Sequence, residues 1–172
     1  MNRLSRFPLF AVLAALLVSL LACDAPIVPR FDSVYFFQEE DVLKAKKVNF
    51  EEMSVYTRGL QTAVAKVLKK AQVKPGNGYI VVAVRSDQET AVWLDMEPAL
   101  HEYYDYEIVE AVKKLRPFAV DNGIVVFAIK MAIETPKHTE KAIPEPQAWK
   151  EAKKKVADPN DVEQLVLSIW PE

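Results

Sequence analysis

Two hydrophobic periods run along the chain, one of about 3.6 residues and one of two, and they predict most of the elements. The clearest helix lies between residues 49 and 71, where apolar residues recur at helical spacing. They are Met53, Tyr56, Leu60, Val64, Val67 and Ala71. Asn49 precedes this run and Glu52 follows three residues later, which predicts a capping box at the helix start.

Three strands and a second helix follow. Tyr79–Arg85 and Thr90–Met96 are separated by a polar turn, which predicts a hairpin. A second helix is expected from Pro98 to Leu115. In Ile124–Glu134, alternate residues are apolar and share one face of a long strand. They are Val125, Phe127, Ile129, Met131 and Ile133, and we expect them to form the core of the sheet.

The flanking segments carry weaker signals. Ser33–Phe37 is a possible edge strand, and Glu39–Lys47 is a short helix or a loop. After residue 134, a Lys-rich helix is expected over Gln147–Ala157. A last helix, capped by Asp158-Pro159, presents an apolar stripe. The stripe consists of Val162, Leu165, Val166, Ile169 and Trp170.

The order helix, strand, strand, helix, strand predicts an α+β fold (an αββαβ core). In it, a small three-stranded sheet carries helices on one face, and C-terminal helices are added to it. The predicted organisation is a signal peptide over residues 1–22, a tether over 23–38 and a core domain over 39–134. A proline-containing connection with the C-terminal helices occupies residues 135–172.

The N-terminal residues have the features of a sorting signal. Arg3 and Arg6 precede the apolar stretch Leu9–Leu21, which is too short to span a bilayer and is typical of a secretory signal peptide. The sequence Leu20-Leu21-Ala22-Cys23 resembles a bacterial lipobox, which implies that Cys23 is lipidated and becomes the first mature residue. In enterobacterial lipoproteins, an aspartate at the position of Asp24 resembles the signal for retention in the inner membrane. We therefore expect a lipid-anchored protein that faces the periplasm, with the inner membrane favoured over the outer one.

The segment Ile108–Ile133 resembles part of the C-terminal domain of TonB and TolA. In those domains, a helix likewise ends in a basic and aromatic run before a proline, and a strand of alternating apolar residues follows. No Tyr-Pro pair precedes the first helix, no Ser-Gly pair follows the hairpin, and no long Pro/Lys spacer is present. The energy-transducing role of TonB is therefore not implied. The resemblance implies a periplasmic domain that receives a partner's strand along a sheet edge. The expected edge is that of the last strand, through Ile124, Val126 and Ala128, unless Ser33–Phe37 or the last helix already covers it.

The composition limits which ligands and partners we expect for this chain. Without Arg3 and Arg6, 20 basic residues face 24 acidic ones, which argues against nucleic acid as a partner. His101 and Asp105 are spaced like two metal ligands on a helix, but two ligands alone make a weak site, and we expect neither metal nor cofactor. His138 lies in a polar connection and is expected to be solvated. Lys150, Lys153, Lys154 and Lys155 form a basic patch that is either a solvated helix face or a contact with lipid head groups.

These observations favour a non-enzymatic, lipid-anchored protein-binding module, an accessory part of a secretion, pilus or transport system. An immunity lipoprotein that neutralises an envelope-targeted toxin is the alternative. An enzyme acting on cell wall or lipid is a third possibility, but no Ser/Cys–His pair or G-x-S-x-G motif supports it. Tyr103 and Tyr106 flank the inward Tyr104 on the second helix and offer a second partner-binding surface, although core packing also explains such aromatics.

Overall fold

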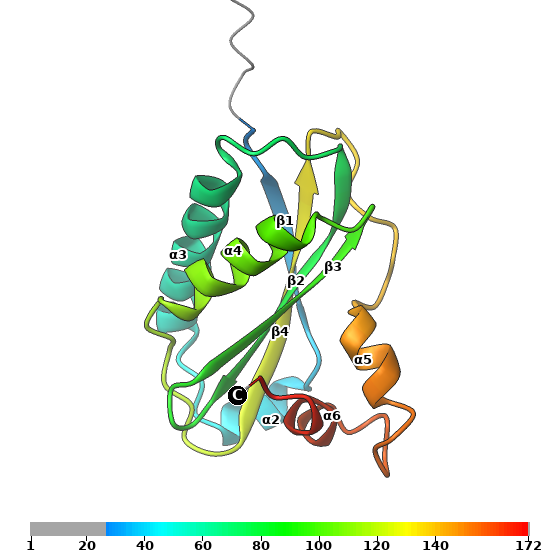
Figure 1. Ribbon diagram of the computed structural model, residues 1–172. Coiled ribbons are helices and arrows are strands. Elements are labelled where there is room, and N and C mark those ends of the chain that lie inside the picture. The colour runs from blue at the N-terminus through cyan, green and yellow to red at the C-terminus, as the bar shows by residue number, and fades with distance from the viewer. Residues whose placement is uncertain (1–26, 172) are drawn as a thin grey trace, which may run out of the picture.

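The computed structural model describes residues 27–171 and contains a four-stranded antiparallel sheet with helices against it (Figure 1). The strands are β1 (Arg30–Phe36), β2 (Gly76–Arg85), β3 (Thr90–Glu97) and β4 (Ile124–Ile133). The helices are α2 (Glu40–Ala45), α3 (Phe50–Leu68), α4 (Glu102–Lys113), α5 (Gln147–Ala152) and α6 (Val162–Ser168). The strands lie in the order β1-β4-β2-β3, which confirms the α+β class.

The sheet has one strand more than the αββαβ prediction. Arg30 pairs with Ala132 and Phe36 pairs with Phe127, so the segment predicted as a tether over residues 23–38 supplies an edge strand from Arg30 onward. The chain is held against the domain even before β1, because Ile27, three residues before the strand begins, is buried in the core. Pro29 favours extended backbone, and an extended segment of this kind is also what a strand requires.

Helices cover both faces of the sheet, whereas the sequence predicted them on one face (Figure 1). α3 and α4 pack on the face formed by Val125, Phe127 and Ile129. α5 and α6 pack on the opposite face, against Val126 and Ala128. The second cover is needed because β2 and the first half of β4 are apolar on both faces.

The predicted helices are confirmed, although several of their boundaries differ. The Asn49 side chain accepts hydrogen bonds from the backbone N–H groups of Glu51 (2.9 Å) and Glu52 (3.2 Å), as expected for an N-cap. α4 begins at Glu102 rather than Pro98, and α6 begins after Asp161 rather than at Asp158-Pro159. α5 ends at Ala152, five residues earlier than predicted.

Candidate partner-binding surface

β4 has no free edge at the residues predicted to receive a partner strand. It lies between β1 and β2, and the side chains of Ile124, Val126 and Ala128 are buried under α5 and α6. The prediction of strand addition at β4 is therefore wrong. The competing arrangement, in which the segment around Ser33–Phe37 covers this edge, is the one that the structure shows.

Beyond the end of β1, hydrogen bonds with Phe37, Gln38 and Glu163 occupy the backbone groups at the edge of β4. The Phe37 N–H donates to the carbonyl oxygen of Val126 at 3.2 Å. The Gln38 side-chain amide then acts like one more residue of backbone: its oxygen accepts from the Val126 N–H (2.9 Å) and its nitrogen donates to the Ile124 carbonyl oxygen (2.6 Å). The Glu163 carboxylate accepts from the Ile124 N–H at 3.1 Å.

Glu163 belongs to a small polar network that ties α6 to the opposite side of the sheet. Its carboxylate pairs with the ammonium group of Lys46 at 2.8 Å, and the Lys46 side chain is only 11% exposed. Lys46 also donates to the carbonyl oxygen of Asn122 at 3.1 Å. Gly123, at φ +69°, leaves room for this pair, because a Cβ there would lie 2.5 Å from the carboxylate and 2.6 Å from the ammonium group.

The open edges of the described sheet are those of β1 and β3. β1 has two unlike halves. In its first half, an extra residue at Asp32–Ser33 shifts the register and forms a bulge, which is a common protection of an edge strand. In its second half, Val34, Tyr35 and Phe36 pair regularly with β4.

The second half of β1 has free backbone groups on its outer side. Because the Phe37 N–H points to β4, the alternation of an antiparallel strand directs the N–H groups of Val34 and Phe36 away from β4. Their side chains lie on the α3 face of the sheet, opposite Ile129 and Phe127.

An apolar groove of about 310 Å³ lies beside this part of β1, between the strand and α3. Its apolar lining comes from Val34, Phe36, Phe50 and Met53, and its polar rim from Ser54, Thr57, Arg58 and Gln61. Phe50 is 47% exposed and Val34 is 37% exposed, so both present apolar surface to solvent. Sequence reasoning missed this site, because the groove joins residues from two elements that do not share a local pattern.

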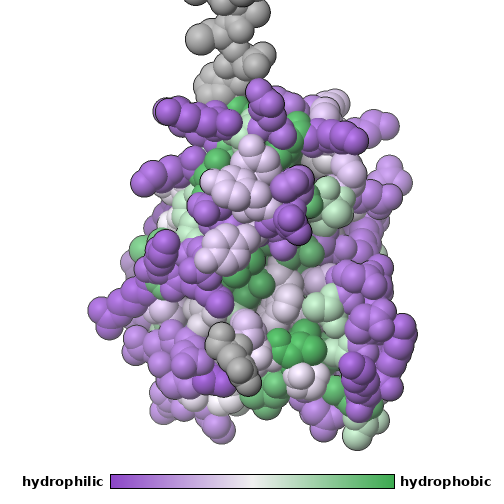
Figure 2. Space-filling model, viewed as in Figure 1, coloured by the Kyte–Doolittle hydropathy of each residue, from purple (hydrophilic) through white to green (hydrophobic). Residues whose placement is uncertain are grey.

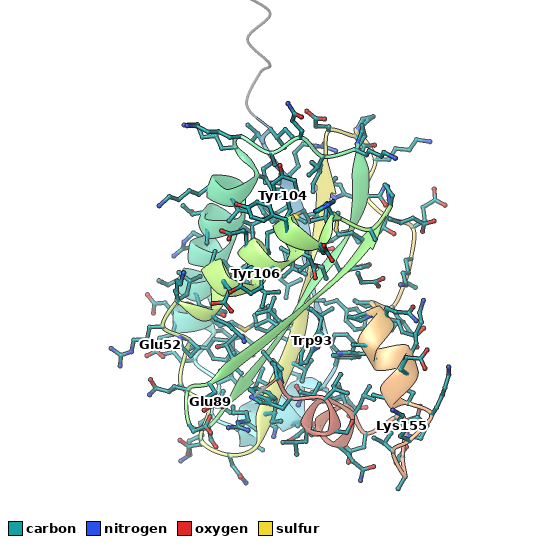
Figure 3. The ribbon with its side chains drawn as sticks, in the orientation of Figure 1. Glu52, Glu89, Trp93, Tyr104, Tyr106 and Lys155 are labelled. Atoms are coloured by element: carbon teal, nitrogen blue, oxygen red, sulfur yellow. The ribbon has the colours of Figure 1, made fainter. Side chains whose placement is uncertain are left out.

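The second predicted surface lies elsewhere, on α4. Tyr103 and Tyr106 are 57% and 61% exposed, whereas the Tyr104 hydroxyl accepts a hydrogen bond from the Gln72 N–H at 3.2 Å. Figure 3 labels Tyr104 and Tyr106 at successive heights along this helix. Tyr106 also lines a hollow of about 540 Å³ between α3 and α4.

Another hollow, of about 580 Å³, lies between the first half of α3 and the segment that leads into β4. Glu52 and Arg116 line it together with Tyr56 and Phe118. Burial raises the pKa of Tyr56 to about 12, and the nearby Thr90 hydroxyl opposes that shift. Neither hydroxyl forms a hydrogen bond of good geometry within the described residues.

The two histidines of the chain and Asp105 do not come together in one site. The His101 imidazole accepts a hydrogen bond from the Tyr103 N–H at 3.2 Å and thereby caps α4. Asp105 is half-buried, and this burial raises its pKa. His138 is half-buried rather than solvated, with a buried ring nitrogen. Between residues 27 and 171, no group of three or more His, Cys, Asp or Glu side chains is placed to hold a metal ion.

The lysines of α5 and its C-terminal extension are largely a solvated face, with local pairs. Lys153 pairs with Glu145 at 2.7 Å, which lowers the pKa of that carboxyl, and Lys154 pairs with Glu151 at 3.1 Å. Cys23 and Asp24, with the whole signal peptide, lie outside the described residues. No helix of the described chain combines the length and the apolar character that crossing a membrane requires.

Comparisons of this chain with protein-family models, with curated proteins and with solved structures found no match.

Proposed function

We propose that this protein is a lipid-anchored protein-binding module of a bacterial envelope, held at the membrane by Cys23 and facing the periplasm. Its role is that of an accessory component in a secretion, pilus or transport system. The lipobox Leu20-Leu21-Ala22-Cys23 supports the anchor, and Asp24 supports the inner membrane. The resemblance of Ile108–Ile133 to TonB and TolA domains supports binding through a sheet edge.

The observation that carries the binding role is the second half of β1. A regular stretch of edge strand, with outward N–H groups on Val34 and Phe36, runs directly beside an apolar groove. An edge strand of this kind is a template for another chain, because its unpaired backbone groups can extend the sheet. In such complexes, backbone hydrogen bonds supply affinity, and pockets for alternate side chains supply selectivity.

The ligand that fits this surface is an extended segment of a protein partner. It pairs with β1 at Val34 and Phe36 and places one apolar side chain between Phe36, Phe50 and Met53. The groove is small, so it admits one large side chain of each partner segment. The bulge at Asp32–Ser33 limits the pairing to the second half of the strand.

The experiment compares partner capture from detergent-solubilised membranes by the wild-type protein and by Val34→Pro. Proline removes the outward N–H of Val34, which no described residue uses, so the domain keeps its fold while strand addition is blocked. Val34→Ala is the matched control, since it removes side-chain atoms and keeps the N–H group. We expect at least a tenfold loss of affinity for Val34→Pro, which corresponds to about 1.4 kcal/mol, and a smaller loss for Val34→Ala.

Equal capture by folded Val34→Pro and wild-type protein would refute binding at β1. Loss of capture in Tyr103→Ala/Tyr106→Ala, with none in Val34→Pro, would assign the partner to α4 instead. The captured protein also separates the two roles. A component of an envelope machine agrees with the accessory role, whereas a toxin identifies an immunity lipoprotein.

A further inference from the structure

Basic side chains gather at the end of the molecule where the described chain begins. Five of them form what we call the basic end: Arg30, Lys69, Lys70, Lys74 and Lys137. All five residues are exposed, and none of them forms an ion pair with another described residue. Exposed acidic residues also lie at or near this end, among them Glu97, Glu134, Glu102 at the start of α4 and Asp32 in β1.

Strand pairing and hydrogen bonds bring these residues together from four parts of the chain. Arg30 pairs with Ala132 and donates from its guanidinium group to the carbonyl oxygen of Thr135 at 2.5 Å. Asn77, three residues after Lys74, also pairs with Ala132, and its side chain donates to the Lys137 carbonyl oxygen at 3.2 Å. Figure 1 shows the end of α3, the start of β1 and β2 and the end of β4 at this same end.

The opposite end of the molecule is rich in acidic residues, and most of its bases are paired with them. It carries the acidic residues of α2, of the first turn of α3 and of the β2–β3 turn, among them Glu52 and Glu89 (Figure 3). Lys44, Lys46, Lys47 and Arg85, which lie at this end, all form ion pairs with acidic residues. Arg116 and Lys155, exposed toward this end, are in no ion pair among the described residues. The two ends of the molecule therefore present charges of opposite sign to their surroundings.

We propose that the basic end docks on the anionic phospholipid surface of the membrane and so fixes the orientation of the domain. This inference rests on the proposed anchor at Cys23 and adds the surface that meets the lipid. Four peptide units separate Cys23 from Ile27, and they span about 14 Å at most. An anchor of that length keeps the basic end within about two screening lengths of the head groups at physiological salt.

The charge distribution selects one orientation among those that the anchor permits. An anionic surface attracts the five unpaired cations and repels the acidic far end, so the long axis of the domain stands away from the membrane. β1 begins at the basic end with Arg30 and runs away from it. Val34 and Phe36 are then held clear of the lipid and open to a periplasmic partner.

Lysine footprinting of the purified mature protein tests the docking surface. The protein is placed in vesicles rich in phosphatidylglycerol or in vesicles of phosphatidylcholine alone, and the acylation of each lysine by a brief amine-reactive pulse is read by mass spectrometry. We expect Lys69, Lys70, Lys74 and Lys137 to lose several-fold reactivity in the anionic vesicles only. Reactivity returns at about 1 M salt, where the screening length falls to about 3 Å. Lys154 and Lys155, which follow α5 and lie away from the basic end, are the internal controls (Figure 3).

A pair of matched variants tests the same surface by affinity. Lys69→Gln/Lys70→Gln/Lys74→Gln and Lys150→Gln/Lys154→Gln/Lys155→Gln each remove three exposed cations. Both triple variants are made in the mature chain carrying Cys23→Ser, so that sedimentation with anionic vesicles measures binding without an acyl anchor. Each lysine near the surface contributes about fivefold, so the first variant binds up to about a hundredfold more weakly, and the second binds nearly as wild type.

The outcomes separate this inference from the anchor. The intact mass of the protein purified from membranes shows whether Cys23 carries acyl chains, and an unmodified mass refutes the anchor. Equal lysine reactivity in both kinds of vesicle, or equal protection of Lys154 and Lys155, refutes docking by the basic end even when the anchor is present. Equal effects of the two triple variants refute it as well.

Discussion

Single side chains take over backbone roles at the start of β4. β1 ends too early to pair with Ile124, and the amide of Gln38 and the carboxylate of Glu163 supply the missing hydrogen-bond partners. An unpaired, buried backbone group would cost free energy comparable to a lost hydrogen bond, so these side chains stabilise the edge of the sheet. The same carboxylate also neutralises Lys46, which is nearly buried.

Glu163→Ala is expected to lower the free energy of unfolding by about 2–3 kcal/mol, because it leaves the Lys46 ammonium group and the Ile124 N–H without their partner. Adding Lys46→Met recovers part of this loss, since it removes the unpaired charge and keeps an apolar side chain of similar length. Urea denaturation of the two single variants and the double variant measures the coupling energy between Glu163 and Lys46. The control is Glu51→Ala, at an exposed position in the first turn of α3. Additive effects would show that the pair does not act as a unit.

At the scale of elements, local patterns were enough where an element is defined by its own residues. The spacing of Met53, Tyr56, Leu60 and Val64 predicted α3, and the alternation in β4 predicted its core face. The place of each strand in the sheet depends on pairing between residues far apart in the chain, and no local pattern contains it. The sequence therefore indicated the kind of surface, a sheet edge, but assigned it to the wrong strand.

The second covered face of β4 leads to an expectation for three variants. Phe127→Ala should cost about 3–5 kcal/mol, because Phe127 is fully buried under α3. Val126→Ala, on the α5–α6 face, should cost about 2 kcal/mol. Lys130→Ala should cost less, about 1 kcal/mol, because Lys130 lies on that same face beyond Val126 and Ala128 but is only half-buried. Its ammonium group lies 5.8 Å from the centroid of the Tyr79 ring.

Chemical denaturation of these three variants checks the arrangement of the helices. If Val126→Ala proves as mild as Lys130→Ala, α5 and α6 do not cover the sheet in solution.

At the scale of the whole molecule, the proposed attachment to the membrane depends on one residue, Cys23. Cys23→Ser is expected to leave a larger, unprocessed precursor and to abolish labelling by an alkyne-palmitate analogue, because the thiol is the group that we propose to accept the lipid. Gel mobility and in-cell labelling measure both effects. Unchanged labelling in this variant would exclude Cys23 as the lipidated residue, whatever the folded domain does.

The central position of β4 also determines the order in which the domain can assemble. β1 is synthesised first, but its only neighbour in the described sheet lies about a hundred residues later in the chain. The β2–β3 hairpin can form as soon as its residues emerge, because its contacts are local. β1 must then remain unpaired until β4 is available, and the second face of the sheet stays open until α6 follows. The strand that we propose as the partner-binding edge of the finished protein is thus an open edge in an incomplete one, exposed to any chain that reaches it before β4 does.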